Sequence, residues 1–278
     1  MLKYYWFKYM GREEFKMELG LKDKCALVMA SSSGLGKAIA AEMAREGANV
    51  MLFSPFAEQL AEAQEDIYKE TGRKPAVFTG SITAPGDIKA LVKETADKFG
   101  PVYALVNNTG GPKPGPFDAF DDAAWQEAYE LCLLSYIRTI REVLPQMREN
   151  GGGRILCSTS SSVKAVLDNL ILSNTFRMGV VGLAKTLSQE LGRDNILVNV
   201  IAPGRIGTAR IDQLDKIRAE KAGISVEELQ KKAFAGIPLG RYGKPEEYGK
   251  LAAFLCAPSN TFITGQTVLV DGGMVKAI

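Results

Sequence analysis

Short apolar runs alternate along the chain with longer segments in which apolar residues recur every three or four positions. The runs have the length and composition of buried strands, and the longer segments have the spacing of helices with one apolar face. Seven strands are predicted, at Cys25–Ala30, Ala48–Ser54, Pro75–Thr79, Val102–Asn107, Arg154–Thr159, Asn195–Ile201 and Gln266–Val270. Strands that alternate with helices in this way favour an α/β fold, here one domain around a doubly wound, seven-stranded parallel sheet.

Two segments interrupt this alternation. Residues 108–116 read NTGGPKPGP, a composition typical of a loop. Residues 204–240 are charged, helix-prone and too long for an ordinary connection, so they are predicted to form a lid at the carboxyl edge of the sheet. The domain spans residues 18–278, and residues 1–17 stand apart from it. Their aromatic stretch, Tyr4–Phe7, belongs either to a flexible extension or to an arm that packs on a neighbouring subunit.

Composition narrows the possible chemistry. The chain has no histidine, which excludes a Ser-His-Asp hydrolase and removes the commonest metal ligand, so no metal site is expected. Its four cysteines contain no C-x-x-C pair, which argues against a disulfide framework or a zinc site. A net charge of +2 gives no reason to expect a nucleic-acid partner. No stretch has the length of a signal-peptide core or a membrane span, so a cytoplasmic location without membrane contact is expected.

A glycine turn follows the first strand. Residues 30–36 read ASSSGLG and lead into a predicted helix over Lys37–Glu46. Glycines at such a turn let the backbone approach a pyrophosphate, and the helix N-terminus supplies oriented N–H groups with a partial positive charge. The turn therefore predicts a Rossmann-type nucleotide site, and the alternative is a turn that serves only to pack strand on helix. The candidate cofactor contacts in the turn are Ala30, Ser32, Ser33, Gly34, Leu35 and Gly36.

This turn resembles the T-G-x-x-x-G-x-G turn of the short-chain dehydrogenase/reductase family, with Met29 and Ala30 where the threonine and the first glycine belong. Three further motifs resemble those of the family in the same order: NNTG at 107–110, APG at 202–204 with Thr208, and PLGR at 238–241 followed by DGG at 271–273. The resemblance covers about residues 20–275. The tail is typical of the family's 3-oxoacyl-acyl-carrier-protein reductase-like members.

The resemblance implies a set of contacts to a nicotinamide cofactor. Asn108 and Gly110 would line it, and Arg177 would hold its ribose. Pro203, Gly204 and Thr208 would border the nicotinamide. The second strand ends at Ser54, where an acidic residue would bind a free ribose 2′-OH and an arginine would favour a 2′-phosphate. Neither is present, so NADP and NAD both stay possible. NADP is favoured because the missing acid removes a repulsion against phosphate.

The family's chemistry uses a tyrosine that exchanges the proton, a lysine that lowers the pKa of that tyrosine, a serine that polarises the carbonyl and an asparagine that supports a water relay. The serine is kept as Ser160, whereas Ser173, Arg177 and Cys132 stand at the tyrosine, lysine and asparagine positions. A serine hydroxyl is a far weaker acid than a cation-assisted phenol, and an arginine stays charged.

A replacement proton donor is not evident. Neither tyrosine nor histidine occurs between Tyr136 and Tyr242. Lys164, in the loop after Ser160, could serve if burial lowered the pKa of its amine, and the alternative is a solvated loop lysine.

Three functions are compatible with these features. The first is an NAD(P)-dependent oxidoreductase that transfers a hydride between nicotinamide and a small carbonyl or alcohol substrate. The second is a catalytically impaired nucleotide-binding pseudoenzyme or sensor, which the replaced tyrosine and lysine would explain. A third, a scaffold without ligand, predicts no nucleotide binding at all. The resemblance also implies a homo-oligomer, a tetramer formed through the long helices and the carboxyl-terminal strand.

Overall fold

Seven parallel strands form the centre of the computed structural model, which describes residues 18–277. The strands are β1 (Cys25–Met29), β2 (Asn49–Ser54), β3 (Ala76–Thr79), β4 (Val102–Asn107), β5 (Gly153–Ser158), β6 (Ile196–Pro203) and β7 (Thr267–Val270). Their order in the sheet is β3-β2-β1-β4-β5-β6-β7, and each neighbouring pair is parallel. The predicted doubly wound sheet is therefore confirmed, with strand ends that move by one or two residues.

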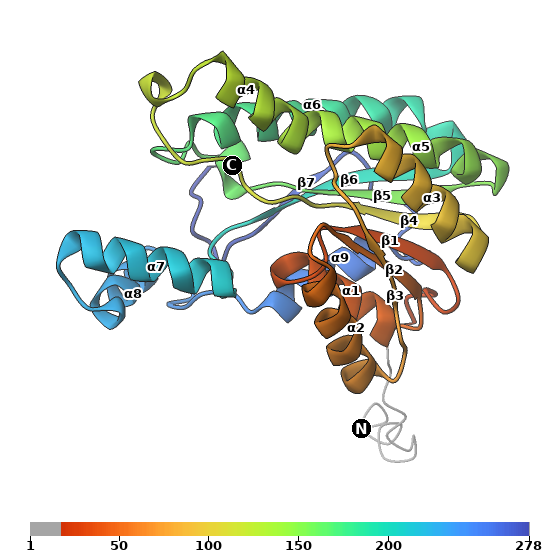
Figure 1. Ribbon diagram of the computed structural model, residues 1–278, viewed down its shortest axis with the longest axis horizontal. Helices are drawn as coiled ribbons and strands as arrows, with labels where there is room; N and C mark the ends of the chain where they lie inside the picture. The colour runs from red at the N-terminus through yellow and green to blue at the C-terminus, as the bar shows by residue number, and fades with distance from the viewer. Residues whose placement is uncertain (1–17, 278) are drawn as a thin grey trace, which may run out of the picture.

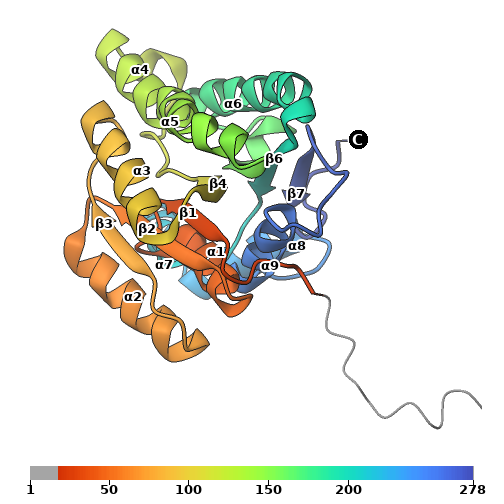
Figure 2. The same cartoon turned by 90° about the vertical axis from the view of Figure 1, so that its right-hand side faces the viewer.

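Helices cover both faces of this sheet, as Figures 1 and 2 show. One face carries α1 (Gly34–Arg45), α2 (Ala57–Thr71) and α9 (Pro245–Leu255). The other face carries α3 (Pro85–Phe99), α5 (Ser135–Glu149) and α6 (Ile171–Glu190). The short helix α4 (Asp122–Tyr129) continues into α5 through one π-helical turn at Glu130–Leu134.

The strands are apolar on both faces because both faces are covered. In β1, Ala26 and Val28 pack in the cluster with α1 and α9, while Leu27 and Met29 pack in the cluster with α5 and α6. This is the reason for the continuous apolar runs in the sequence, where a half-exposed sheet would alternate apolar and polar residues. The edge strand β7 differs, since all four of its residues are only half-buried.

The carboxyl edge of the sheet gathers the unusual segments. The strand order reverses between β1 and β4, which is where open α/β sheets form binding crevices. The predicted lid contains two helices, α7 (Ala209–Ala222) and α8 (Val226–Ala235). Its two ends meet, because the backbone N–H of Gly207 donates to the carbonyl of Gly243 and the N–H of Gly243 donates to Arg205. The chain therefore leaves the sheet and returns to it at one point.

Ala30 was expected to end the first strand, but the strand stops at Met29 and Ala30 has a left-handed backbone with φ +48°, because the chain turns there into α1. The aromatic stretch in residues 1–17 lies outside the described residues. Between residues 18 and 277, no helix is both long and apolar enough to span a bilayer.

Candidate active site

The glycine turn opens directly onto the N-terminus of α1. The N-cap residue, Ser33, forms no side-chain cap, so the first amides of the helix keep their donors for another partner. Gly36 is required by packing, since a Cβ there would lie 2.2 Å from the carbonyl oxygen of Ala30. The tight turn therefore places its own backbone next to the first amides of α1. This is the arrangement that binds phosphates in nucleotide sites.

Two side-chain contacts hold this turn in place. The amide of Asn108, just after β4, donates a hydrogen bond of 3.3 Å to the Ala30 carbonyl. The hydroxyl of Ser32 lies 2.9 Å from that of Ser54, which is buried at the end of β2 and also accepts the N–H of Phe56. The predicted contacts Ser32, Ser54 and Asn108 are therefore brought together around the turn. Leu35 differs, because its side chain packs against the core cluster of α1 and α9 and leaves only its backbone for a ligand.

The loop after β6 closes the opposite side of the turn. Thr208, the N-cap residue of α7, has its methyl group 3.8 Å from the position of a Cβ on Gly34. Pro203 ends β6, Gly204 follows it at the start of this loop, and both are half-buried. These positions surround one crevice, and an uncapped helix N-terminus with a close-packed glycine turn fits the pyrophosphate of a dinucleotide.

The four positions of the family's catalytic residues also lie at this edge. Ser160 follows β5, and its side-chain oxygen accepts the N–H of Ser162 at 3.2 Å, which leaves its proton free to donate. Ser173 and Arg177 share one face of α6 and are both more than nine-tenths buried. Cys132 lies within the π-helical turn before α5, a local irregularity that is frequent at functional sites.

The guanidinium of Arg177 is held by three acceptors. Its Nη1 donates to the phenol oxygen of Tyr136 and to the carbonyl of Ser158, each at 3.1 Å. Its Nη2 donates to the carbonyl of Gly110 at 3.1 Å, and its Nε is buried without a partner. Gly110 and Arg177, each predicted to contact the cofactor, are thus joined by a hydrogen bond.

Burial sets the ionisation of the groups around Arg177. Burial alone would lower the pKa of the guanidinium, but the neighbouring Tyr136 and Cys132 outweigh it and the pKa is raised, so the charge is kept. Burial raises the pKa of Tyr136 to about 12, against the opposing effect of Arg177. Burial likewise raises the pKa of the Cys132 thiol. The site therefore holds one fixed positive charge surrounded by neutral groups.

Tyr136 is the residue that sequence reasoning missed. The search for a replacement phenol covered the residues after Tyr136, whereas Tyr136 itself touches the catalytic helix. The available signal was its spacing, four residues after Cys132 on the same helix face. Lys164, by contrast, is exposed, which matches the solvated alternative and removes the burial on which a catalytic role for it depended.

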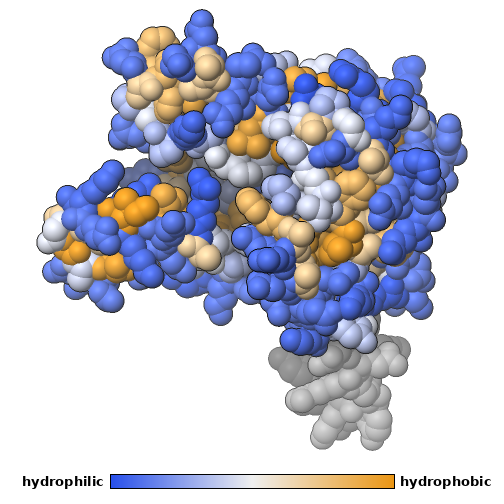
Figure 3. Space-filling view, in the orientation of Figure 1, coloured by the Kyte–Doolittle hydropathy of each residue, from blue (hydrophilic) through white to orange (hydrophobic). Residues whose placement is uncertain are grey.

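The surface is hollowed in front of this edge, between the lid helices and the layer that carries α4, as Figure 3 shows. The lid reaches across the hollow near the loop of residues 108–116. Nη2 of Arg210, in the first turn of α7, lies 3.3 Å from the position of a Cβ on Gly111. Residues of α7 and of the loop after β4 therefore approach each other at one side of the hollow.

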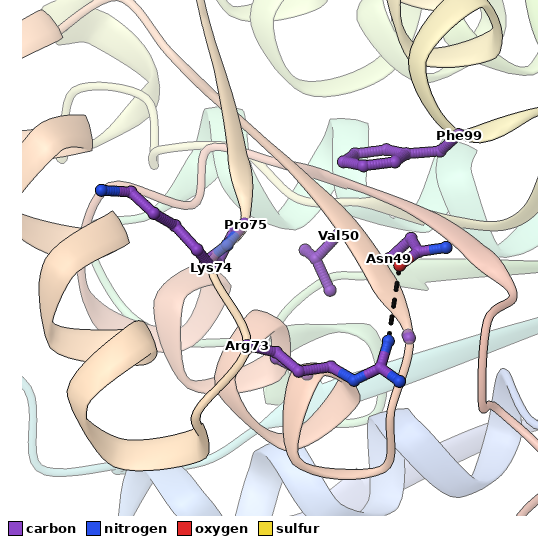
Figure 4. A pocket seen from close by; sticks show the side chains of 8 residues that line it. Asn49, Val50, Arg73, Lys74, Pro75 and Phe99 are labelled. Carbon is purple, nitrogen blue, oxygen red and sulfur yellow. Dashed lines mark hydrogen bonds between the residues drawn. The ribbon is translucent and has the colours of Figure 1, made fainter.

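A second hollow lies at the opposite edge of the sheet, where β2 and β3 begin. Figure 4 shows Arg73 bonded to Asn49 there, beside Lys74 and Phe99. Both cations are already used, since Arg73 pairs with Asp23 and Lys74 with Glu65. Elsewhere in residues 18–277, no three histidine, cysteine, aspartate or glutamate side chains are grouped to hold a metal ion.

Comparison with known proteins agrees with this geometry. Residues 29–275 match the family model described as enoyl-(acyl carrier protein) reductase. The chain is 32% identical over 260 residues to 7alpha-hydroxysteroid dehydrogenase of Escherichia coli, covering 94% of this chain and 97% of that protein. It is 31% identical over 253 residues to a 3-oxoacyl-acyl-carrier-protein reductase of Staphylococcus aureus, covering 90% and 98% of the two chains.

Solved structures give the same picture. L-sorbose reductase from Gluconobacter frateurii, solved with NADPH and L-sorbose, matches with a TM-score of 0.90 at 30% identity, covering 94% of this chain and all of that one. A 7alpha-hydroxysteroid dehydrogenase with NADH and 7-oxo glycochenodeoxycholic acid matches with a TM-score of 0.84 at 32% identity, covering 93% and 97% of the two chains. The chain belongs to the short-chain dehydrogenase/reductase family. Its relatives include reductases and dehydrogenases that work on carbonyl or alcohol groups.

Proposed function

We propose that this protein is an NAD(P)-dependent oxidoreductase that transfers a hydride between nicotinamide and a carbonyl or alcohol carbon. The observation that carries the proposal is the meeting of three parts at one edge of the sheet. These are the uncapped N-terminus of α1, the loop at Thr208 that closes over Gly34, and the buried face of α6 with Ser173 and Arg177. The first two suit the pyrophosphate of a dinucleotide. The third suits the cofactor ribose at Arg177 and the reacting carbonyl at Ser173.

Each residue then has a defined task. The first amides of α1 would bind the pyrophosphate, and Asn108 holds the turn at Ala30 through its hydrogen bond to the carbonyl. NAD(P), when bound, supplies or accepts the hydride. The hydroxyls of Ser160 and Ser173 would donate hydrogen bonds to the substrate oxygen. The fixed charge of Arg177 would hold the cofactor ribose and stabilise a developing alkoxide. Since Lys164 is exposed, we assign the proton to water that enters the crevice with the substrate.

Ser32 and Ser54 bear on the choice between NADP and NAD. The hydroxyls of Ser32 and Ser54 meet where the adenosine ribose of a bound cofactor would lie, and neither carries a charge that repels a 2′-phosphate. NADPH is bound by the L-sorbose reductase and NADH by the hydroxysteroid dehydrogenase named above. We propose NADP as the preferred cofactor of this chain, with NAD as the alternative.

Nicotinamide fluorescence tests the proposal. Purified protein is titrated into NADPH and, separately, into NADH, and hydride transfer to a panel of ketones and alcohols is then followed at the nicotinamide absorbance. Binding with turnover is the expected result. Binding without turnover on any compound would favour the pseudoenzyme, an alternative that the dehydrogenase and reductase relatives do not favour. Binding of neither cofactor would end the oxidoreductase proposal.

We also propose that the protein is a homotetramer. A groove between α5 and α6 is lined by apolar residues and two arginines: Ile137, Ile140, Arg141, Leu144, Pro145, Arg148, Leu183 and Leu187. At the far end of the sheet, β7 is half-exposed along its length and Phe262 beside it is 97% exposed. A second copy of the chain on each surface would bury this apolar area. Sedimentation equilibrium tests the proposal, and a monomer at micromolar concentration would contradict it.

A cytoplasmic location belongs to the same proposal. All four cysteines are free and buried, as expected for a protein of a reducing compartment. Fractionation of cells followed by immunodetection of the native protein would test this location directly.

A further inference from the structure

Tyr136 occupies the interior between the catalytic helix and the sheet. It lies on α5, one turn after Cys132, and has no exposed surface. Its hydroxyl donates a hydrogen bond of 2.6 Å to the carbonyl of Ser158, and its oxygen accepts one from Arg177 at 3.1 Å. The hydroxyl of Tyr136 therefore both donates and accepts a hydrogen bond within the protein. These two bonds set the orientation of the phenol without a ligand.

Arg177 is a buried cation whose three acceptors are all neutral. They come from three separate elements: Tyr136 from α5, Ser158 from the end of β5 and Gly110 from the loop after β4. Burying a charge among neutral partners is unfavourable unless its geometry is well defined by hydrogen bonds. Tyr136 supplies the only side-chain acceptor among the three, and it is thus the one that a substitution can remove.

The pair also matches in shape. A guanidinium is a planar fork that can donate from Nη1 to two acceptors at once, here the phenol oxygen and the Ser158 carbonyl. A lysine carries its three donors on one compact ammonium and lacks this fork. The phenol at position 136 is consequently useful to an arginine at position 177 in a way that it would not be to a lysine.

We propose that Tyr136 is a positioning residue that holds the guanidinium of Arg177 at the cofactor crevice, and that it does so specifically because position 177 is an arginine. The inference rests on the proposed binding of a nicotinamide cofactor. Without the phenol oxygen, Nη1 keeps only the Ser158 carbonyl, and the long side chain gains freedom that must be lost again when the cofactor binds. The cost should therefore be seen in cofactor affinity.

A double-mutant cycle tests the pair. The dissociation constant for the cofactor that the unmodified protein binds, NADPH or NADH, is measured by nicotinamide fluorescence for Y136F, R177K and Y136F/R177K. Y136F is expected to raise it about fivefold to tenfold when residue 177 is arginine, since residues in one hydrogen-bond network couple by this amount. In the R177K background the same change should alter it less than about twofold. A merely structural role would weaken binding equally in both backgrounds.

Tyr248 provides the matched control. It is equally buried, and its hydroxyl hydrogen-bonds with Oγ of Ser158 at 2.9 Å, but it accepts no hydrogen bond from the guanidinium of Arg177. Y248F should leave the dissociation constant unchanged, and an equal loss in Y136F and Y248F would overturn the proposal. If Y136F unfolds while Y136F/R177K folds, the proposal is supported, because only the arginine then needs the phenol; if both unfold, it is overturned. If the unmodified protein binds neither cofactor, the proposed function fails first, and this inference with it.

Discussion

The hydroxyl of Tyr242 donates a hydrogen bond of 2.8 Å to the carboxylate of Asp215, a residue of α7 with no exposed surface. The second oxygen of Asp215 lies 3.7 Å from Nη1 of Arg205, at the base of the lid, and forms no hydrogen bond. A buried carboxylate thus ties the first lid helix to the two chain segments where the lid begins and ends.

Removing the hydrogen bond between Tyr242 and Asp215 should make residues 204–240 unfold locally more often. Y242F leaves the buried carboxylate of Asp215 with only the distant arginine, which should lower the free energy of unfolding by about 1–3 kcal/mol. Limited proteolysis should then cut residues 204–240 faster than in the unmodified protein. Tyr68 is 45% exposed, so Y68F serves as the control and should change neither measurement. Unchanged proteolysis in Y242F would mean that Asp215 does not secure the lid.

Substitutions at Ala30 and Gly36, two positions of the glycine turn, should change the free energy of unfolding in opposite directions. Ala30 has φ +48°, so A30G relieves backbone strain and should raise the free energy of unfolding by about 0.5–1 kcal/mol. A Cβ on Gly36 would meet the Ala30 carbonyl at 2.2 Å, so G36A should lower it by about 1–3 kcal/mol and abolish cofactor binding. Urea unfolding and nicotinamide fluorescence measure the two effects.

A control for this pair exists within α1. Ala44 is buried in the helix interior, where A44G should destabilise the protein, because glycine there gains freedom in the unfolded chain. A destabilising A30G would contradict the strained conformation of the turn.

Restoring the family's acid should raise the rate. S173Y/R177K places a phenol and an ammonium on the same face of α6, and general acid catalysis is worth about 10²–10⁴-fold in rate. We therefore expect kcat for ketone reduction to rise by at least about tenfold. S173F/R177K is the control, with the ring but without the hydroxyl. An equal rate for the two double variants would show that the phenol proton is not used.

Stability should fall at alkaline pH. The pKa of Tyr136 is raised by burial to about 12, above its unfolded value of 10. Above about pH 10 the folded protein keeps the phenol proton that the unfolded chain has lost. The contribution of the buried neutral phenol to the free energy of unfolding is therefore complete below about pH 10 and is lost as the pH rises towards 12. Between pH 8 and pH 11, Tyr136 alone should lower the free energy of unfolding by about 1–2 kcal/mol. Tyr248 and the buried thiols of Cys25 and Cys157 act in the same direction, so the total decline in urea unfolding should be larger. Y136F should make the decline shallower, and a pH-independent stability would contradict the burial of these phenols.

The thiols should be unreactive in the folded protein. All four cysteines are buried, and burial raises the pKa of Cys25 and Cys157 to about 12. The thiolate is the reactive form, so a thiol reagent such as dithionitrobenzoate should label none of them within minutes at pH 8. Unfolding in guanidinium chloride should release four equivalents, one for each cysteine. Rapid labelling of Cys132 in the native protein would mean that the π-helical turn opens to solvent.

The architecture could be predicted from local sequence patterns, because such patterns depend only on residues that are close together in the chain. The apolar runs predicted all seven strands, since strands covered on both faces must be apolar throughout. The glycine turn predicted a helix after the first strand, although α1 begins at Gly34 and not at the expected Lys37. A tight approach of backbone to backbone at Gly36 excludes any side chain there. The motif order placed Ser160, Ser173 and Arg177 at one edge, because the carboxyl ends of parallel strands meet there.

The partner of Arg177 could not be obtained in that way. Tyr136 and Arg177 are separated by 41 positions and lie on different helices, and their contact depends on how α5 and α6 pack against β5. The burial of Ser54, the exposure of Lys164 and the tie between Asp215 and Tyr242 have the same origin. The sequence alone determined the fold, the family resemblance and the place of the crevice, because periodicity, turn chemistry and motif order are local. Which polar groups are buried together, and hence which charge faces the crevice, was decided by tertiary packing, because only packing removes water and leaves a buried donor to find its acceptor.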